Sequence, residues 1–401
     1  MVWPKFNNQQ QKIASKILSS GKVNYWTGQE CKSFEFEFSN YYKRKYSVCV
    51  SNGSVALEIA LKSLPLKAGD HVIVTPRSFI ISASCVVNMG LIPVFADVDQ
   101  NGNLSSKTIL DVYTKKVKAV IIVHTNGLSC DLDPIIKLKK KKNFYLIEDC
   151  AQAHGAVYKK KPVGSFGDIS VWSFCQDKII STGGEGGMIS TNNKKIWSRC
   201  WSLKDHGKNH ALVFKKKHKT GFRWLHKELG SNHRMTEIQG ALGRYQLKRI
   251  DKTIKIRNKI ANQIIRGLKK FYIDDNLILR PNFKCANCPD KKNSFICNLC
   301  THAFYRLNFF LNKKKFSRKF NLIKVIKELN YEGIVCGVGN CPEIYREKVF
   351  INNNLFKKKR LNNAKYLGEI SLVFPIDPTA QKLVLKKSIN KISKVFEKYN
   401  V

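Results

Sequence analysis

Residues 46–64 read Tyr-Ser-Val-Cys-Val-Ser-Asn-Gly-Ser-Val-Ala-Leu-Glu-Ile-Ala-Leu-Lys-Ser-Leu. The first five, residues 46–50, are rich in β-prone side chains and predict a strand. A turn with Asn and Gly follows, and residues 54–64 place apolar side chains at helical spacing. A strand that leads through a short turn into a helix is the repeating unit of an α/β sheet, so this stretch predicts that fold class.

The same alternation continues to about residue 191. Helical spacing returns between several apolar runs, for example at residues 79–89. The runs themselves predict strands at residues 71–75, 92–97, 118–124, 144–148, 168–174 and 187–191. Strands joined by helical crossovers form a largely parallel sheet covered on both faces, and such sheets bind ligands where their strands end. We therefore expect functional side chains at the carboxyl ends of these strands.

A second, smaller domain is predicted for the rest of the chain. After a basic, irregular stretch at residues 204–230, apolar spacing predicts one long helix from about residue 234 into the 250s. Strands and helices alternate again beyond it, with candidates at residues 304–310, 320–329 and 382–399. A chain of 401 residues can bury two such cores. We predict a large domain with an N-terminal arm at 1–251 and a small α/β domain at 252–401.

The composition is typical of a folded protein that does not enter a membrane. A hydrophobic share of 43% argues against general disorder. No stretch approaches the roughly 20 consecutive apolar residues of a membrane span. The opening Met1-Val2-Trp3-Pro4-Lys5 lacks the apolar core of a signal peptide. We therefore expect a soluble, cytoplasmic protein.

The chain is strongly basic, with 71 Lys and Arg against 29 Asp and Glu and a formal charge of +42. Such a charge raises the question of nucleic acid as a partner. The basic residues are dispersed in short runs, however, at residues 139–142, 215–217, 313–315 and 357–360. Dispersed runs favour solvated helix faces over one nucleic-acid groove. A positive surface also raises the encounter rate with anionic substrates such as nucleotide diphosphates.

Two polar segments at predicted strand ends are candidates for a ligand site. Ser51-Asn52-Gly53-Ser54 opens a helix, whose N-terminal N–H groups can bind phosphate, although an ordinary turn and helix cap use the same residues. Asp149 ends a later strand. A carboxylate there can hold a pyridine ring nitrogen protonated, cap a helix or bind a metal. Neither segment decides between these possibilities alone.

Two further segments follow. Ser173-Phe174-Cys175-Gln176-Asp177-Lys178 ends another strand and runs into a glycine cluster at residues 182–187, a tight turn into the last strand. A lysine at this position can form an imine, whereas most lysines of such a basic chain lie on the surface. Asn232-His233-Arg234-Met235-Thr236-Glu237 precedes the long helix, and alone it is a helix N-terminal turn. The order and spacing of the four segments are more informative than any one of them.

Together these segments resemble the DegT/DnrJ/EryC1/StrS family, the pyridoxal-phosphate-dependent nucleotide-sugar aminotransferases of the aspartate aminotransferase fold, fold type I. The resemblance covers nearly the whole chain. It rests on residues 20–28, 34–35, 93–99, 148–155, 173–178, 234–239 and 341–345. It implies a mostly parallel central sheet with helices on both faces and a smaller C-terminal α/β domain.

The resemblance also implies pyridoxal 5'-phosphate as the cofactor and a role for each matching residue. Lys178 matches the lysine that forms the Schiff base and acts as general base, and Asp149 matches the partner of the pyridinium nitrogen. The remaining matches are Gly53, Ser54 and Ser173 at the cofactor phosphate, Phe79 stacked on the ring, Gln152 near the ring oxygen, and Asn232, which reaches the phosphate from the other subunit. A homodimer with shared active sites is therefore implied.

The implied reaction moves an amino group, usually from L-glutamate, to C3 or C4 of a keto nucleotide-sugar for amino-sugar, O-antigen or other surface-glycan biosynthesis. Members of the family with histidine in place of the lysine carry out dehydration, so Lys178 favours amino transfer. A sugar dehydrase or non-sugar transaminase of the same fold stays an alternative, as does a basic nucleic-acid-binding protein. Cys175-Gln176-Asp177 departs from the His or Pro and Thr common before the lysine, which leaves the local contacts open.

Four of the 13 cysteines form a cluster, Cys285-Ala-Asn-Cys288 and Cys297-Asn-Leu-Cys300. Four thiolates in such paired knuckles are a tetrahedral zinc arrangement. The spacing predicts a zinc-knuckle insertion at 285–300 that braces a loop and takes no part in catalysis. The intervening loop is shorter than in common zinc ribbons, so four reduced thiols are the alternative.

Overall fold

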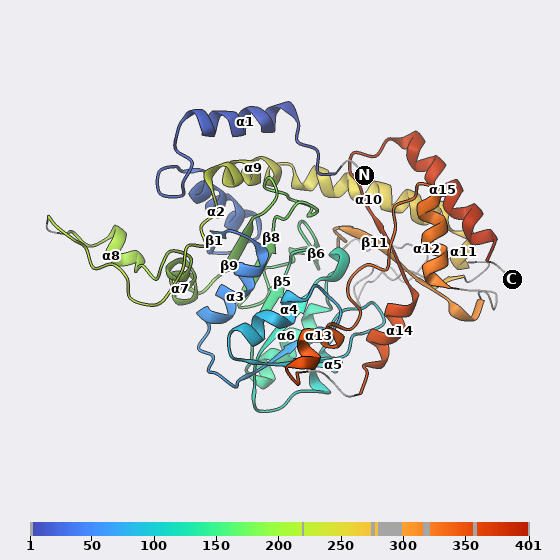
Figure 1. Cartoon of the computed structure of the whole chain (residues 1–401), viewed down its shortest axis with the longest axis horizontal. Coiled ribbons are helices and arrows are strands. Elements are labelled where there is room, and N and C mark those ends of the chain that lie inside the picture. The colour runs from blue at the N-terminus through green and yellow to red at the C-terminus, as the bar shows by residue number, and fades with distance from the viewer. Residues whose placement is uncertain are drawn as a thin grey trace.

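The computed structural model describes residues 3–218, 220–273, 277–279, 299–315, 321–355 and 359–399. Within these ranges, seven strands form a central sheet in the order β1-β9-β8-β5-β4-β2-β3 (Figure 1). Their bounds are β1 (Tyr46–Val50), β2 (His71–Val74), β3 (Ile92–Phe95), β4 (Val117–Val123), β5 (Tyr145–Asp149), β8 (Ile169–Ser173) and β9 (Gly187–Thr191). Only β9 of this sheet runs antiparallel to its neighbours. All seven predicted strands are therefore present, and the mostly parallel sheet is confirmed.

Alternate side chains of the strands enter two separate apolar clusters, one on each face of the sheet. Val120 and Ile122 of β4 pack in the cluster that contains Phe34 of α2, while Ala119 and Ile121 pack in the other. Burial on both faces explains the continuous apolar runs in the sequence. The helices of this part of the chain are α1 (Asn8–Ser19), α2 (Glu30–Tyr41), α3 (Gly53–Ser63), α4 (Ile81–Asn88), α5 (Ser106–Leu110), α6 (Leu132–Lys142), α7 (Lys194–Lys204), α8 (His210–Phe214) and α9 (Glu237–Leu247).

The long helix predicted from residue 234 is two helices, α9 and α10 (Ile250–Gly267). The first begins after Thr236, whose side chain accepts a hydrogen bond from the Gln239 N–H in a capping box. Leu247, Ile250 and Ile254 all pack in the same core cluster. Their spacing of three and four residues is that of a continuous helix, so the apolar pattern could not reveal the break at residues 248–249.

A third apolar cluster forms the core of the C-terminal part. There the strands β10 (Ile278–Leu279), β11 (Arg306–Leu311) and β12 (Ser371–Pro375) pair antiparallel. The helices around them are α11 (Lys270–Ile273), α12 (Leu322–Tyr331), α13 (Lys348–Asn352), α14 (Asn362–Ile370) and α15 (Lys382–Glu397). The helix α10 spans both parts, because Ile254 packs in a cluster of the central sheet and Ile260 in the C-terminal cluster.

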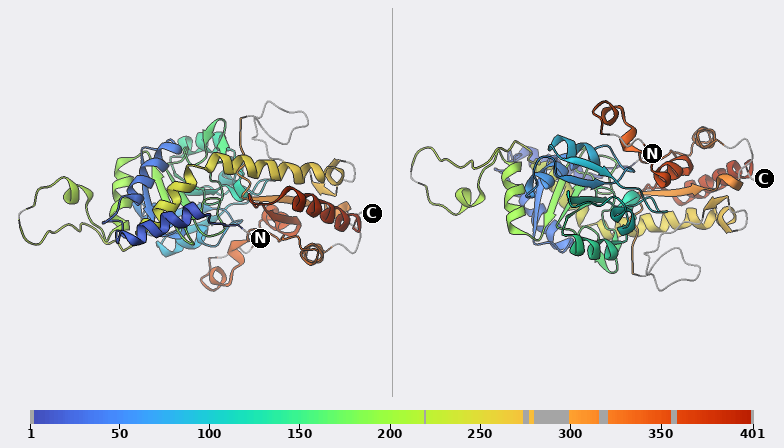
Figure 2. Two further views of the ribbon diagram at one scale, coloured as in Figure 1. Left: turned by 90° about the horizontal axis from the view of Figure 1, so that it is seen from above. Right: turned by 90° about the horizontal axis from the view of Figure 1, so that it is seen from below.

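One segment stands away from the rest of the molecule. Figures 1 and 2 show α8 and the chain around it projecting beyond the central sheet, at the end of the molecule opposite the C-terminal part.

A short hairpin, β6 (Val157–Tyr158) with β7 (Lys161–Pro162), completes the strands. In the part of the chain that the structure describes, no helix has both the length and the apolarity to cross a membrane.

Candidate active site

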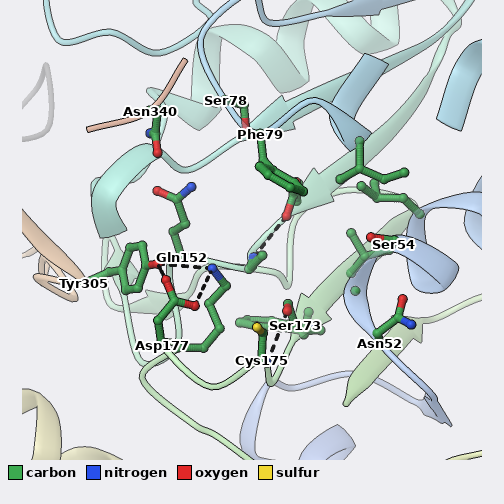
Figure 3. A pocket seen from close by; sticks show the side chains of 18 of the residues that line it. Asn52, Ser54, Ser78, Phe79, Gln152, Ser173, Cys175, Asp177, Tyr305 and Asn340 are labelled. Atoms are coloured by element: carbon green, nitrogen blue, oxygen red, sulfur yellow. Dashed lines mark hydrogen bonds and ion pairs between the residues drawn. The ribbon is translucent and has the colours of Figure 1, made fainter. Parts of the chain in front are cut away.

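A cavity of about 600 Å³ opens where β1, β5 and β8 end, and the C-terminal part contributes to its wall. Most of the predicted site residues line it: Gly53, Ser54, Phe79, Asp149, Gln152, Ser173 and Lys178. Figure 3 shows Ser54, Phe79, Gln152 and Ser173 among the side chains arranged around this space. Asn232 is exposed and does not belong to this lining; it forms an isolated bridge with Asp205. The structure thus brings together residues that lie up to 125 positions apart, which the carboxyl ends of parallel strands explain.

The start of α3 forms a cradle of backbone N–H groups in this wall. The Asn52 side chain caps the helix by accepting from the Val55 N–H at 2.9 Å. The first N–H groups of a helix have no partner within it, so those of Gly53 and Ser54 can bind an anion. A Cβ on Gly53 would lie 2.6 Å from the Ser173 Cβ, and glycine therefore lets the helix approach the end of β8. These residues fit a cofactor phosphate.

Gly53→Ala is accordingly expected to push α3 away from β8, lowering the free energy of unfolding by about 1 to 3 kcal/mol and weakening cofactor binding. Gly337→Ala is the matched control, because a Cβ there would meet no atom within 4 Å. Cofactor affinity from visible titration and stability from urea unfolding check the pair. Equal stability and equal cofactor affinity in the two variants would contradict the proposed role of Gly53 at the cofactor phosphate.

Asp149 offers a carboxylate that fits a cationic ring nitrogen. It is buried at the end of β5, and its Oδ1 accepts from the Ala151 N–H at 3.0 Å. Burial raises the pKa of this carboxyl, against the opposing effects of the Ala151 N–H and the Lys178 charge. Because a buried carboxylate is costly without a partner, a protonated ring nitrogen would complete its environment.

Gln152 and Phe79 lie on other parts of the same wall (Figure 3). The Gln152 Oε1 accepts from the Asn126 N–H at 2.7 Å, which fixes the amide so that its Nε2 donors remain for a ligand oxygen. Phe79 is 68% exposed although it is aromatic. A large exposed ring in a cavity wall is suited to cover one face of a planar ligand.

Lys178 lies among groups from both parts of the chain. Its Nζ donates to the Tyr305 Oη at 3.1 Å and pairs with the Asp177 Oδ1 at 3.1 Å (Figure 3). Tyr305 and Arg306, at the start of β11, line the cavity together with Asn340. The sequence did not identify these three, because no local pattern distinguishes them and only packing of the C-terminal part brings them to Lys178.

Glu148, one residue before Asp149, is fully buried and does not line the cavity. Its carboxylate accepts from the backbone N–H groups of Gly164 at 2.9 Å and Gly167 at 2.6 Å, and it pairs with Arg44 at 3.5 Å. His124 Nδ1 accepts from the Cys130 N–H, so the ring proton lies on Nε2, 3.3 Å from the Glu148 Oε2. His124 and Glu148 with Cys150 have the spacing of a metal site. The N–H donors already occupy the carboxylate, so this cluster anchors β5 and does not require a metal.

Glu148→Gln is expected to lower the free energy of unfolding at neutral pH by about 3 to 5 kcal/mol, because Arg44 is left buried without its counter-ion. Burial raises the pKa of Glu148, but His124 and Arg44 outweigh burial and hold it below its usual value. A lowered carboxyl pKa stabilises the fold above the unfolded-state value of about 4.3. That stability is lost as the pH falls through the lower folded-state pKa.

Urea unfolding at pH 7 and at lower pH therefore checks the Glu148 network. The variant should show a flatter acid dependence than the native chain. Glu369→Gln, which removes a half-exposed pair with Lys313, is the control and should cost no more than about 1 kcal/mol. Equal losses for both variants would contradict an anchoring role of Glu148.

Comparison with known proteins identifies the family. A family model described as "DegT/DnrJ/EryC1/StrS aminotransferase family" matches residues 4–393. GDP-perosamine synthase of Escherichia coli O157:H7 is 37% identical over 65% of this chain and 68% of its own length. The dTDP-3-amino-3,6-dideoxy-alpha-D-galactopyranose transaminase of Aneurinibacillus thermoaerophilus is 33% identical over 67% of this chain and 70% of its own.

A solved structure agrees with these relatives. The aminotransferase from Psychrobacter cryohalolentis superposes with a TM-score of 0.93 at 43% identity, covering 99% of this chain and 98% of that chain. The resemblance inferred from the sequence motifs is therefore confirmed. The chain belongs to the DegT/DnrJ/EryC1/StrS aminotransferase family of enzymes.

Proposed function

We propose that this enzyme, with pyridoxal phosphate as cofactor, transfers an amino group to the keto carbon of a nucleotide-sugar. The observation that carries the proposal is the convergence of Lys178, Asp149 and the Gly53 cradle on one cavity of a family member. The names of the two relatives differ in the nucleotide, GDP in one and dTDP in the other. The class of substrate we propose is thus a keto nucleotide-sugar, with amination at C3 or C4.

Pyridoxal phosphate, when bound, supplies an aldehyde carbon that exchanges amines and a ring that accepts electrons. The residues that line the cavity would bind and position this cofactor. Asp149 would keep a proton on the ring nitrogen, and the N–H groups of Gly53 and Ser54 with the Ser173 hydroxyl would bind the phosphate. Gln152 would donate to the ring oxygen, and Phe79 would cover one ring face.

Lys178 holds the cofactor and moves the proton. Its amine is the only lysine amine among the described residues that line the cavity. The Lys178 amine would hold the cofactor and, when free, would act as the base that moves a proton to and from the donor Cα. We propose L-glutamate as the donor in the first half-reaction. The keto nucleotide-sugar accepts the amine in the second.

The test is a panel of keto nucleotide-sugars incubated with the holoenzyme and L-glutamate, with product structure read by NMR. A new C–N bond at C3 or C4 supports the proposal. Loss of a hydroxyl group without a gained amine would show a dehydrase, and amination of simple keto acids alone would show a non-sugar transaminase. The family assignment gives no support to nucleic-acid binding as the main activity.

We also propose that the enzyme is a homodimer in which Asn232 reaches the phosphate of the partner's cofactor. Supporting features are the exposed position of Asn232 and the apolar side chains of the projecting segment nearby. Phe222, Trp224 and Leu229 are 79%, 82% and 89% exposed. Apolar groups so exposed on one projection favour a protein partner, and a second copy of the chain would bury them.

Trp224→Ser is therefore expected to weaken the dimer, because it removes a large apolar side chain from the proposed interface. Tyr331→Ser removes a 92% exposed aromatic side chain from α12. It should leave the molar mass of the dimer in solution unchanged. Light scattering over a range of protein concentrations checks both variants. A monomeric native chain would rule the proposal out.

Three sequence predictions stay proposals. The first is the division into domains at 1–251 and 252–401. The second is the cytoplasm as location. The third is a structural zinc, for which Cys285, Cys288 and Cys297 lie outside the described residues. The fourth cysteine, Cys300, is buried, and the Lys159 N–H donates to its Sγ at 3.4 Å. Metal analysis at about one zinc per chain would support this site.

A further inference from the structure

The Lys178 amine lies at the centre of a closed set of polar contacts. It pairs with the Asp177 Oδ1 at 3.1 Å and donates to the Tyr305 Oη, also at 3.1 Å. The Tyr305 hydroxyl in turn donates to the Asp177 Oδ2. Arg306 closes the set, 3.4 Å from the Asp177 Oδ2 and 3.1 Å from the Tyr305 Oη. The amine thus contacts one carboxylate oxygen of Asp177 and the Tyr305 hydroxyl, while the other Asp177 oxygen contacts Tyr305 and Arg306.

The other titratable groups that face Lys178 do not supply a second counter-ion. Asp149 senses the Lys178 charge, but in the proposed function it serves the ring nitrogen. Burial and the Lys178 charge lower the pKa of His154 to about 3, so this ring is neutral. Burial raises the pKa of the Cys175 thiol, which therefore stays protonated at neutral pH. Asp177 is left as the carboxylate in direct contact with the amine.

We propose that Asp177, as counter-ion, and Tyr305, as a neutral hydrogen-bond partner, form a pair that positions the Lys178 nitrogen and stabilises its protonated form during amino transfer. This inference rests on the proposed function. Lys178 gains and then gives up one proton, while Asp177 stays ionised and Tyr305 keeps its own proton. Lys178 therefore ends with the same number of protons as it had at the start, and no other proton donor or acceptor is needed.

Asp177 belongs to the segment that departs from the pattern common before the lysine, and its contacts are with Lys178, Tyr305 and Arg306. Burial lowers the pKa of Lys178, but Tyr305 and Asp177 outweigh burial and raise it. The Asp177 side chain is half exposed, so water screens part of its charge. Tyr305 comes from the C-terminal part of the chain, which contributes to the cavity wall. The pair therefore depends on the packing of that part against the central sheet.

A pH titration of the holoenzyme tests the pair directly, because the lysine nitrogen joined to the cofactor titrates and its protonation changes the visible spectrum. Asp177→Asn should move the midpoint down by about one pH unit or more, since an opposite charge at this distance favours the protonated form. Tyr305→Phe should move it in the same direction by less. Glu185→Gln is the matched control, because Glu185 lines the same cavity but contacts the Cys175 Sγ at 3.7 Å.

A lowered midpoint in Asp177→Asn with an unchanged one in Glu185→Gln supports the pair. An Asp177→Asn midpoint equal to that of the native enzyme overturns the pair while leaving the proposed function intact. A native protein that shows no lysine-bound cofactor spectrum overturns the proposed function itself. Should Asp177→Asn fail to fold, Tyr305→Phe decides: a lowered midpoint supports the pair and an unmoved one overturns it.

Discussion

Lys178→Ala should lose the visible spectrum of the lysine-bound cofactor and almost all amino transfer, with kcat lower by about 100-fold to 10,000-fold or more. The alanine can neither hold the cofactor covalently nor move the proton. Among the described residues that line the cavity, the other cation is Arg306, whose guanidinium cannot replace an amine in imine chemistry. The spectrum and the single half-reaction with L-glutamate are the measurements.

The chain offers a closely matched control for this experiment. Lys139 pairs with the Asp168 Oδ1 at 3.1 Å, the same distance as the pair between Lys178 and Asp177, but lies outside the cavity. Lys139→Ala should keep the spectrum and the turnover. Turnover by Lys178→Ala at the native rate would exclude Lys178 as the catalytic lysine.

Asp149→Asn is expected to produce the second large loss, because a neutral amide cannot keep the proton on the ring nitrogen. Removing one partner of a buried charge pair costs about 3 to 5 kcal/mol. At 1.36 kcal/mol per factor of ten, that is a loss of roughly 160-fold to 5,000-fold in turnover. The amide keeps the shape of the side chain and can still accept from the Ala151 N–H, so the fold should persist.

Asp168→Asn is the control for Asp149. Asp168 precedes β8, at the end of the sheet away from the cavity, and accepts from the Leu146 N–H at 2.8 Å. It carries the same change of charge without access to the cofactor. Kinetics with L-glutamate and the cofactor spectrum are compared for both. Native turnover in Asp149→Asn would show that the ring nitrogen has another partner.

The local sequence predicted the secondary structure correctly where a repeating pattern of apolar residues has one structural cause. Alternating strands and helices predicted the sheet, because strands buried on both faces need continuous apolar runs. It failed at residues 248–249, where the turn between α9 and α10 preserves helical spacing. It also placed β11 two residues early, since Phe304 and Tyr305 are as apolar as the strand that follows.

The sequence likewise identified some residues of the candidate site and missed others. Asp149 and Ser173 end strands, Gly53 and Lys178 follow strands, and the geometry of a parallel sheet gathers such residues at one edge. Their assigned roles stay predictions until the variants are measured. Tyr305 and Arg306 were not identified, because they are separated from Lys178 by more than 120 residues and lie at the start of a strand of another sheet.

The sequence alone therefore determined the fold class, the family resemblance and the strand ends at which chemistry was expected, because each depends on local periodicity or a short motif. Only the tertiary structure decided what surrounds the Lys178 amine. Asp177 is adjacent in sequence, but its partnership with Tyr305 requires the C-terminal part to pack against the ends of β5 and β8. Contacts of this kind depend on how two separately formed cores meet, and no local pattern records that.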